Sequence, residues 1–393
     1  MLLDRLVSVA KNLEDPNFFL LGPNIKGLYF FGFWQPPIKR MRNNLYNMFL
    51  VCTILFVLSQ IIDLYYLRHD LAKALDNFSL TALSVVSCAK GWSFVLFKAR
   101  WYELVKSISQ EERTEIQKQN KEALMEMRRY RRYARSMTFS YWLLVLITYL
   151  ALLLAPLMRY IFSTAYKEGI KEGIEPYPQI INSWFPFDNT KIPGYIYGSA
   201  IHLIFSTQGS AAIAMYDTCV VVIIIYLKGE LRVLKNQCKR IFETEEKQCT
   251  NIFMVNIKEC HRKHNVLMRQ YTLFNSLVSP IMFFYVLICS ITICCSVVQI
   301  NLTGITTYKK LWVIQYTVGQ VFQLFMLCWH ANEVFVESYA VDRGVYDSDW
   351  WKSNVFIRKH LLLLAGKLNQ PFILTAGPFS KLTVLTFISV SIT

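Results

Sequence analysis

Long runs of apolar residues are the feature of this chain that most limits its fold. A helix that crosses the core of a bilayer needs roughly 20 mostly apolar residues. Seven segments meet or approach that length, at 45–67, 75–97, 136–158, 197–227, 272–300, 311–336 and 372–393. A segment inside a membrane must satisfy its backbone hydrogen bonds internally, so each is predicted to be a helix. The expected fold class is all-α, a polytopic membrane protein with seven transmembrane helices.

The basic residues between these segments predict the orientation of the chain. Lysine and arginine gather on the cytosolic side of membrane proteins. Of the 42 in this chain, 32 lie in one alternating set of connections and 8 in the other set. The first set includes the N-terminal residues, so the N-terminus is predicted to be cytosolic and the C-terminus, after seven spans, extracellular. This orientation is opposite to that of a G-protein-coupled receptor. It also accounts for the net charge of +15 without a nucleic-acid partner.

The connections divide the chain into four regions. Residues 1–44 are predicted to form a cytosolic segment, and residues 45–336 hold spans one to six with long cytosolic helical extensions. The outer connection at 159–196 contains four prolines and many aromatic residues, which suits either a lid over a cavity or a packed connector. Residues 337–371 form a second cytosolic segment, and residues 372–393 form the last span.

Four short motifs resemble the insect odorant receptor family. They are Gly32-Phe-Trp-Gln-Pro36, Trp184-Phe-Pro-Phe-Asp188, Ala331-Asn-Glu running on to Tyr346-Asp-Ser-Asp-Trp350, and Pro371-Phe-Ile-Leu-Thr-Ala-Gly377 with Phe379, Thr386 and Phe387. The length, the orientation and the charge pattern also fit that family. The resemblance therefore covers essentially the whole chain, and the C-terminal motif is its most specific part.

This resemblance implies a subunit of a ligand-gated, non-selective cation channel in the plasma membrane of a sensory neuron. Four subunits would surround one pore, with span seven lining it and residues 337–371 anchoring contacts between subunits. Residues 228–271 lack the long insertion of the family's co-receptor. The chain therefore resembles an odorant-tuning subunit whose partner in a heterotetramer is that co-receptor. Gustatory receptors are the nearest alternative, and a secondary transporter, which should show internal repeats, is the alternative from another class.

The last span is expected to contribute Thr383, Thr386, Phe387 and Val390 to the pore. Pro378 suits the first turn of a helix, so the predicted helix runs from Pro378 to Thr393 and is about 24 Å long. That length falls short of the roughly 30 Å core of a bilayer. The expectation is that a tail of roughly a dozen residues, which would include the gate, is missing from the sequence. A shortened pore helix is the alternative.

A volatile odorant is small and uncharged, so its pocket should be apolar with few polar groups. The resemblance places that pocket in the outer half of the bundle formed by spans two to six. Depth and helical spacing then select the candidates Phe78, Ala82, Val85, Tyr149, Leu152, Pro156, His202, Phe205, Ser206, Trp312, Gln315 and Tyr316. His202 and Gln315 are the candidate donors to an ester, ketone or aldehyde oxygen. Ordinary helix packing is the alternative for each residue, and about a third are expected to line the pocket.

Two charged residues, Lys90 and Asp217, lie inside the spans at comparable depth. A charge at membrane depth is costly and generally finds a partner. The two residues are therefore predicted to pair and to brace the bundle below the pocket. The alternative is that Lys90 faces lipid and extends its charged end to the membrane surface.

Other chemistry is not indicated by the sequence. Cys260, His261 and His264 lack a fourth ligand at a settled spacing, so no metal site is predicted. The sequence has no nucleophile elbow, phosphate loop or zinc-protease motif, which argues against an enzyme and against a cofactor.

The arginines at 128–135 are expected to meet anionic lipid headgroups. Glycosylation at the sequons of Asn77 and Asn301 is left open.

Overall fold

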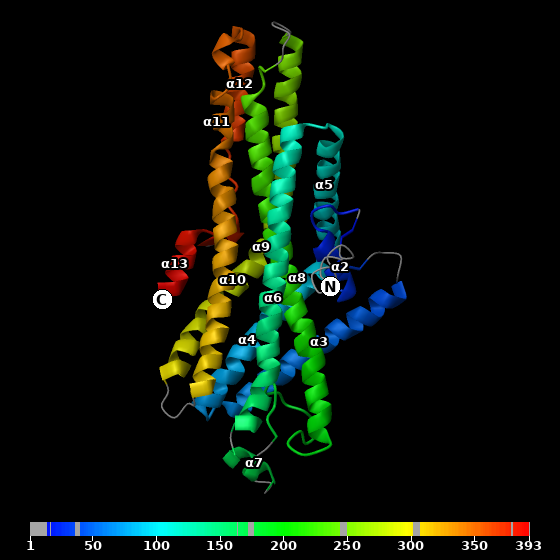
Figure 1. Ribbon diagram of the computed structural model, residues 1–393, viewed down its shortest axis with the longest axis vertical. Helices are drawn as coiled ribbons and strands as arrows, with labels where there is room; N and C mark the ends of the chain where they lie inside the picture. The colour runs from blue at the N-terminus through cyan, green and yellow to red at the C-terminus, as the bar shows by residue number, and fades with distance from the viewer. Residues whose placement is uncertain are drawn as a thin grey trace, which may run out of the picture.

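The computed structural model shows an elongated bundle of helices (Figure 1). It describes residues 14–15, 17–35, 40–162, 164–171, 177–243, 250–301, 307–378 and 380–392. Within these residues, six helices are long and apolar enough to cross a membrane. They are α3 (Arg40–Leu67), α4 (Leu71–Leu96), α6 (Lys121–Phe162), α8 (Gly194–Lys239), α9 (Thr250–Asn301) and α10 (Thr307–Tyr339). The predicted class, a helical polytopic membrane protein, is confirmed.

The shorter helices mark the two ends of the bundle. Figure 1 shows α5 (Lys98–Gln117), α11 (Val341–Tyr346) and α12 (Val355–Leu368) at one end, which we call the α12 end. The helix α7 (Thr164–Lys171) lies at the opposite end, the α7 end. A single 3-10 turn, η1 (Trp350–Lys352), precedes α12. Three junctions rich in lysine and arginine, α5 to α6, α8 to α9 and α11 to α12, therefore lie toward the same end of the bundle (Figure 1).

The helix α8 lies at the centre of the bundle. It packs against α2 (Gly22–Phe30), α4, α6, α9, α10 and α11. Its residues 211–227 are buried all round, as expected for a helix that is apolar on every face. Gly229 continues this close packing, because a Cβ atom there would lie 2.2 Å from the ring of Tyr130 on α6. Residues on α8 can therefore reach several neighbouring helices.

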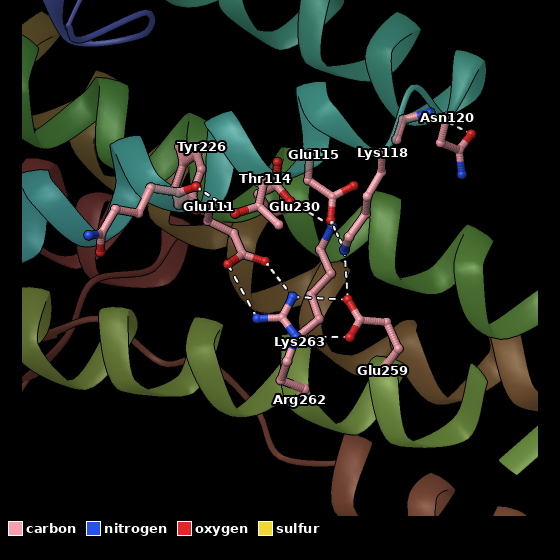
Figure 2. A network of polar contacts seen from close by, with 12 residues as sticks. Glu111, Thr114, Glu115, Lys118, Asn120, Tyr226, Glu230, Glu259, Arg262 and Lys263 are labelled. Carbon is pink, nitrogen blue, oxygen red and sulfur yellow. Dashed lines mark hydrogen bonds and ion pairs between the residues drawn. The ribbon is translucent and has the colours of Figure 1, made fainter. Parts of the chain in front are cut away.

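A buried ionic network joins four helices near the α12 end (Figure 2). The Nζ atom of Lys263 on α9 lies 2.9 Å from Oε2 of Glu230 on α8 and 3.2 Å from Oε1 of Glu115 on α5. The hydroxyl of Tyr130 on α6 donates to Oε1 of Glu230 over 3.0 Å. Removing one partner of a buried pair leaves an uncompensated charge, so this network ties the four helices to one relative arrangement.

The segment before the last helix differs from the prediction. A helix from Pro378 is wrong, because Thr375–Ala376 (β1) pairs antiparallel with Ser380–Lys381 (β2). Gly377 makes the turn between them with a φ of +67°, a conformation that favours glycine. Side chains on α9 hold this segment in place, since Asn275 accepts from the backbone N–H of Thr375 over 3.0 Å.

The last helix, α13, covers Val384–Ile392. It begins six residues later than predicted, after the hairpin, and the hydroxyl of Thr383 accepts from the N–H of Thr386 at its start. Its nine residues rise about 14 Å. Thr393 and the side chain of Val390 lie outside the described residues.

Candidate functional site

An apolar cavity of about 170 Å³ lies among α3, α4, α6, α8 and α10. Phe33, from the chain between α2 and α3, and Ile181, from the connection between α7 and α8, complete its wall. Ile181 thus makes the 177–193 connection part of the cavity wall. A single lining residue suits a packed connector as well as a cover over the cavity.

Three of the predicted helix faces meet at this cavity. Its lining includes Tyr149, Leu152, Phe205, Ser206, Trp312, Gln315 and Tyr316. These residues come from α6, α8 and α10, at the helical spacing from which they were selected. Packing around a common cavity therefore follows from sequence spacing on these three helices.

The face chosen on α4 needs correction, because Phe78, Ala82 and Val85 do not line the cavity. The cavity-facing positions of α4 are Leu80, Leu83, Ser84, Ser87, Cys88 and Gly91. A shift of two residues turns a helix by about 200°, so the cavity lies on nearly the opposite face. Depth and helical spacing group residues on one face of α4, but they do not decide which face meets the cavity. That depends on how α4 packs against its neighbours, so Phe78, Ala82 and Val85 were assigned to the wrong side of this helix.

His202 and Pro156 are also absent from the cavity wall. The Nε2 atom of His202 lies 2.6 Å from the hydroxyl of Ser183, and its ring packs between Phe56 and Phe185 at centroid distances of 5.8 and 5.4 Å. This buried histidine fastens the 177–193 connection to α8 instead of facing a ligand. Its hydrogen-bond partner lies in an irregular loop, which helical spacing does not place.

Most polar side chains of the cavity already have partners. The hydroxyl of Tyr316 donates to the carbonyl of Ser79 over 2.9 Å and accepts from Nε2 of Gln320 over 2.6 Å. Oε1 of Gln320 in turn accepts from Thr292 over 3.0 Å. Gln315 differs, because its side chain makes no hydrogen bond to the part of the chain that the structure describes. Its amide is therefore available to a ligand.

Lys90 and Asp217 lie in direct contact beside this cavity. Their Nζ and Oδ1 atoms are 2.7 Å apart, and neither side chain is exposed. The second oxygen of Asp217 accepts from the hydroxyl of Tyr141 over 2.8 Å and from the amide of Gln323. Tyr141 and Gln323 both line the cavity. The ion pair is therefore one hydrogen bond away from the space that a ligand would occupy.

Sequence reasoning missed Tyr141, Gln320 and Gln323. A usable signal was present, because Tyr316, Gln320 and Gln323 recur at helical spacing within an apolar span. A polar stripe of this kind at membrane depth indicates function. All three residues lie farther from the outer ends of their spans than the predicted pocket residues on the same spans.

The remaining candidates lie outside this cavity. The ring of Phe387 on α13 packs against Phe325 on α10 with centroids 5.2 Å apart, so it faces the bundle of its own subunit. The hydroxyls of Thr383 and Thr386 are 3.3 Å apart.

Among the described residues, no cluster of three or more His, Cys, Asp or Glu side chains could hold a metal. Asn77 is buried and donates to Asp63 over 2.8 Å, which leaves its amide covered.

The family model described as 7tm Odorant receptor matches residues 70–392 of the chain. Odorant receptor Or2 of Anopheles gambiae is 24% identical over 131 residues, which cover 33% of this chain and 34% of that protein. Odorant receptor 10 of Aedes albopictus is 30% identical over 114 residues, or 29% of this chain and 30% of that protein. The chain thus spans about a third of the length of these curated relatives in each match.

Two solved structures share the fold over nearly the whole chain. The insect olfactory receptor OR5 from Machilis hrabei in complex with eugenol has a TM-score of 0.77 at 16% identity, covering 96% of each chain. The structure of OR5 from Machilis hrabei has a TM-score of 0.79 at 15% identity, covering 94% of this chain and 93% of that one. At this identity the likeness establishes the architecture, a bundle of membrane-spanning helices.

Proposed function

The chain belongs to the 7tm odorant receptor family, and on that premise we propose that it is the odorant-binding subunit of a heteromeric, ligand-gated cation channel. Membership of this family makes it a multi-pass membrane protein and not an enzyme. The proposed location is the plasma membrane of a sensory neuron, with the N-terminus and the α12 end in the cytosol. The uneven distribution of lysine and arginine supports that orientation. The proposed partner is the family's co-receptor.

The cavity with its single unengaged amide is the observation that supports an odorant ligand. A cavity of about 150 Å³ in another protein holds benzene, so about 170 Å³ suits a molecule with roughly one ring. Its walls are mostly apolar, and Gln315 is placed to donate to one acceptor oxygen. We therefore expect small, neutral ligands such as ketones, esters or phenols. The related receptor of Machilis hrabei was solved with eugenol.

The helix α10 gives a physical route from the cavity to the pore. It carries Gln315, Gln320 and Gln323 on the cavity side and packs against α13 through Phe325 and Phe387. A ligand that binds better to one position of α10 shifts the population of that position. In this proposal the shift moves α13, and Thr386 on this helix lines the pore together with Thr383 just before it and the same residues of three other subunits.

The α12 end supports a contact between subunits. Leu362 and Leu363 on α12 are 70% and 72% exposed, although both are apolar. Exposed apolar patches on a folded protein mark interaction sites. The proposal is that residues 337–371 meet the corresponding region of neighbouring subunits.

Electrophysiology in cells that express this chain tests the proposal. Cells with and without a co-receptor are exposed to a panel of small volatile ketones, esters and phenols. An odorant-evoked cation current that requires both subunits is the expected result. Ligand-driven uptake without any conductance would instead identify a transporter and contradict the channel.

A further inference from the structure

The N-terminal segment before α3, residues 20–34, packs inside the bundle. Leu21 and Leu28 of this segment are almost fully buried. The side chain of Asn24 donates to the hydroxyl of Thr218 on α8 over 2.8 Å. Gly27 allows this approach, because a Cβ atom there would lie 2.3 Å from the sulfur of Met215. The segment is thus bound to α8 beside the residue that pairs with Lys90, and is not a peripheral tail.

A glycine turn at the end of α2 sends the chain back toward the cavity. Gly32 has a φ of +80°, its N–H donates to the carbonyl of Tyr29 over 3.3 Å, and the N–H of Phe33 donates to the carbonyl of Leu28 over 2.9 Å. These two bonds and the left-handed residue form the Schellman motif that ends many helices. A Cβ atom at Gly32 would also lie 2.1 Å from the ring of Tyr46. The turn therefore depends on glycine and fixes the direction in which Phe33 leaves it.

Phe33 closes one end of the cavity. Its ring is 2% exposed and lines the cavity. It lies against Gly91, where an added Cβ atom would be 2.7 Å from Cε1 of the ring. Gly91 is the cavity-lining residue of α4 nearest the α12 end, next to Lys90. The adjacent carbonyl of Phe31 accepts from the amide of Gln208, another lining residue, over 3.1 Å. The segment is therefore fixed to the cavity wall on both sides of the turn.

We propose that Phe33 is a specificity-determining residue, and that the N-terminal segment sets the greatest length of ligand that the cavity accepts. This inference rests on the proposed role of the cavity as the odorant site. Shortening the Phe33 side chain extends the cavity past Gly91. A methyl group added at Gly91, itself part of the cavity wall, crowds the Phe33 ring and takes up space at this end of the cavity.

A series of linear methyl ketones of increasing chain length tests the inference. Currents are recorded from wild-type, Phe33→Leu, Phe33→Ala and Gly91→Ala subunits, each with the co-receptor. For the Phe33 variants we expect the preferred ketone to be longer. The half-maximal concentration should fall about fourfold for each added methylene that fits. For Gly91→Ala we expect a shorter preferred ketone. Phe30→Ala is the matched control, because Phe30 is in the same segment but 73% exposed.

A second readout keeps the test independent of the current. Thermal stabilisation of the purified chains by the same ketones reports binding alone, because a ligand of the folded state raises the midpoint of unfolding. A length shift in binding without any current supports the role of Phe33 and contradicts the channel function. Wild-type currents with an unchanged length preference in both Phe33 variants contradict the role of Phe33 alone. No stabilisation of the wild-type chain, and no current, with any of the ketones, esters and phenols contradicts both.

Discussion

The Nζ atom of Lys90 on α4 lies 2.7 Å from Oδ1 of Asp217 on α8, with neither side chain exposed. The carboxylate is also held by Tyr141 and Gln323, from α6 and α10. Four helices therefore meet at one buried charge pair, and two of the side chains that bind it also line the ligand cavity. The stability of the bundle and the state of the cavity are physically connected at this point.

Charge substitutions at this pair are expected to depend on each other. Lys90→Met alone leaves Asp217 buried without a counter-charge, and Asp217→Asn alone leaves Lys90 without one, each at a cost of roughly 3–5 kcal/mol. Exchanging both charges, Lys90→Asp with Asp217→Lys, restores the pairing. Surface expression measured by labelling of intact cells should fall for either single change and recover in part for the exchange. Lys73→Met, at an exposed lysine of the same helix, is the control. Equal loss in all three pair variants would count against bracing by the ion pair.

Gln315→Leu should lower sensitivity to ligands with an acceptor oxygen. A neutral hydrogen bond contributes about 0.5–1.5 kcal/mol, or roughly a twofold to tenfold change in half-maximal concentration. The response to a hydrocarbon of similar shape should stay within twofold of wild type. Dose–response recordings with a matched ketone and hydrocarbon measure this difference. An equal change for both ligands would mean that Gln315 contributes packing rather than a hydrogen bond.

The protonation of Glu112 gives a prediction about pH. Burial raises the pKa of this α5 carboxyl from an ordinary value of 4.5 to about 7, although Arg131 lies 3.5 Å away. Between these values the folded protein keeps a proton that the unfolded chain releases, so stability falls as pH rises through this window. Each unit of difference between the folded and unfolded pKa of Glu112 corresponds to about 1.4 kcal/mol in the free energy of unfolding.

Glu112→Gln removes that titration. The stability of the variant relative to wild type should therefore increase from pH 5 to pH 7 and then level off. Unfolding midpoints of the two purified proteins across this range make the comparison. A constant difference between them at every pH would show that Glu112 does not titrate in this range.

The network in Figure 2 should matter more than exposed ion pairs on the same helix. Lys263→Met leaves Glu115 and Glu230 buried without their shared cation. The free energy of unfolding is expected to fall by roughly 3–5 kcal/mol. Arg269→Met removes a pair with Glu103 whose side chains are 78% and 50% exposed, and exposed pairs contribute about 0–1 kcal/mol. Thermal unfolding of both variants tests this order. Similar losses in the two variants would contradict it.

The sequence predicted the parts of the fold that depend on local pattern. Apolar length located the six long helices, and charge predicted which connections share an end of the bundle. Depth and helical spacing, within the region that the family resemblance indicated, selected Tyr149, Phe205 and Gln315, which line one cavity. These features follow from a period of 3.6 residues and from the cost of charge in a membrane, which do not need tertiary information.

Features that depend on contacts between distant segments were not predictable in the same way. The α4 face was missed because depth and helical spacing define a face of the helix but not the neighbours that this face meets. The hairpin around Gly377 was missed because Asn275 and Ser279, about a hundred residues away, hold it. Phe33 was missed because the turn at Gly32, and not the residues after it, gives the segment its direction.

In the proposed function, odorants open the channel from the cavity among α3, α4, α6, α8 and α10. Gly319 on α10 lines this cavity, and an added Cβ atom there meets no other atom within 4 Å. A leucine at this position should therefore occupy the space without disturbing the helices. Val318→Phe adds bulk at the neighbouring position, which is 61% exposed, and serves as the control.

The decisive measurement is the odorant-evoked current of Gly319→Leu, co-expressed with the co-receptor and matched for surface level to wild type and Val318→Phe. We expect at least a tenfold loss of sensitivity for Gly319→Leu, with Val318→Phe close to wild type. Wild-type sensitivity of Gly319→Leu to every active odorant would contradict it.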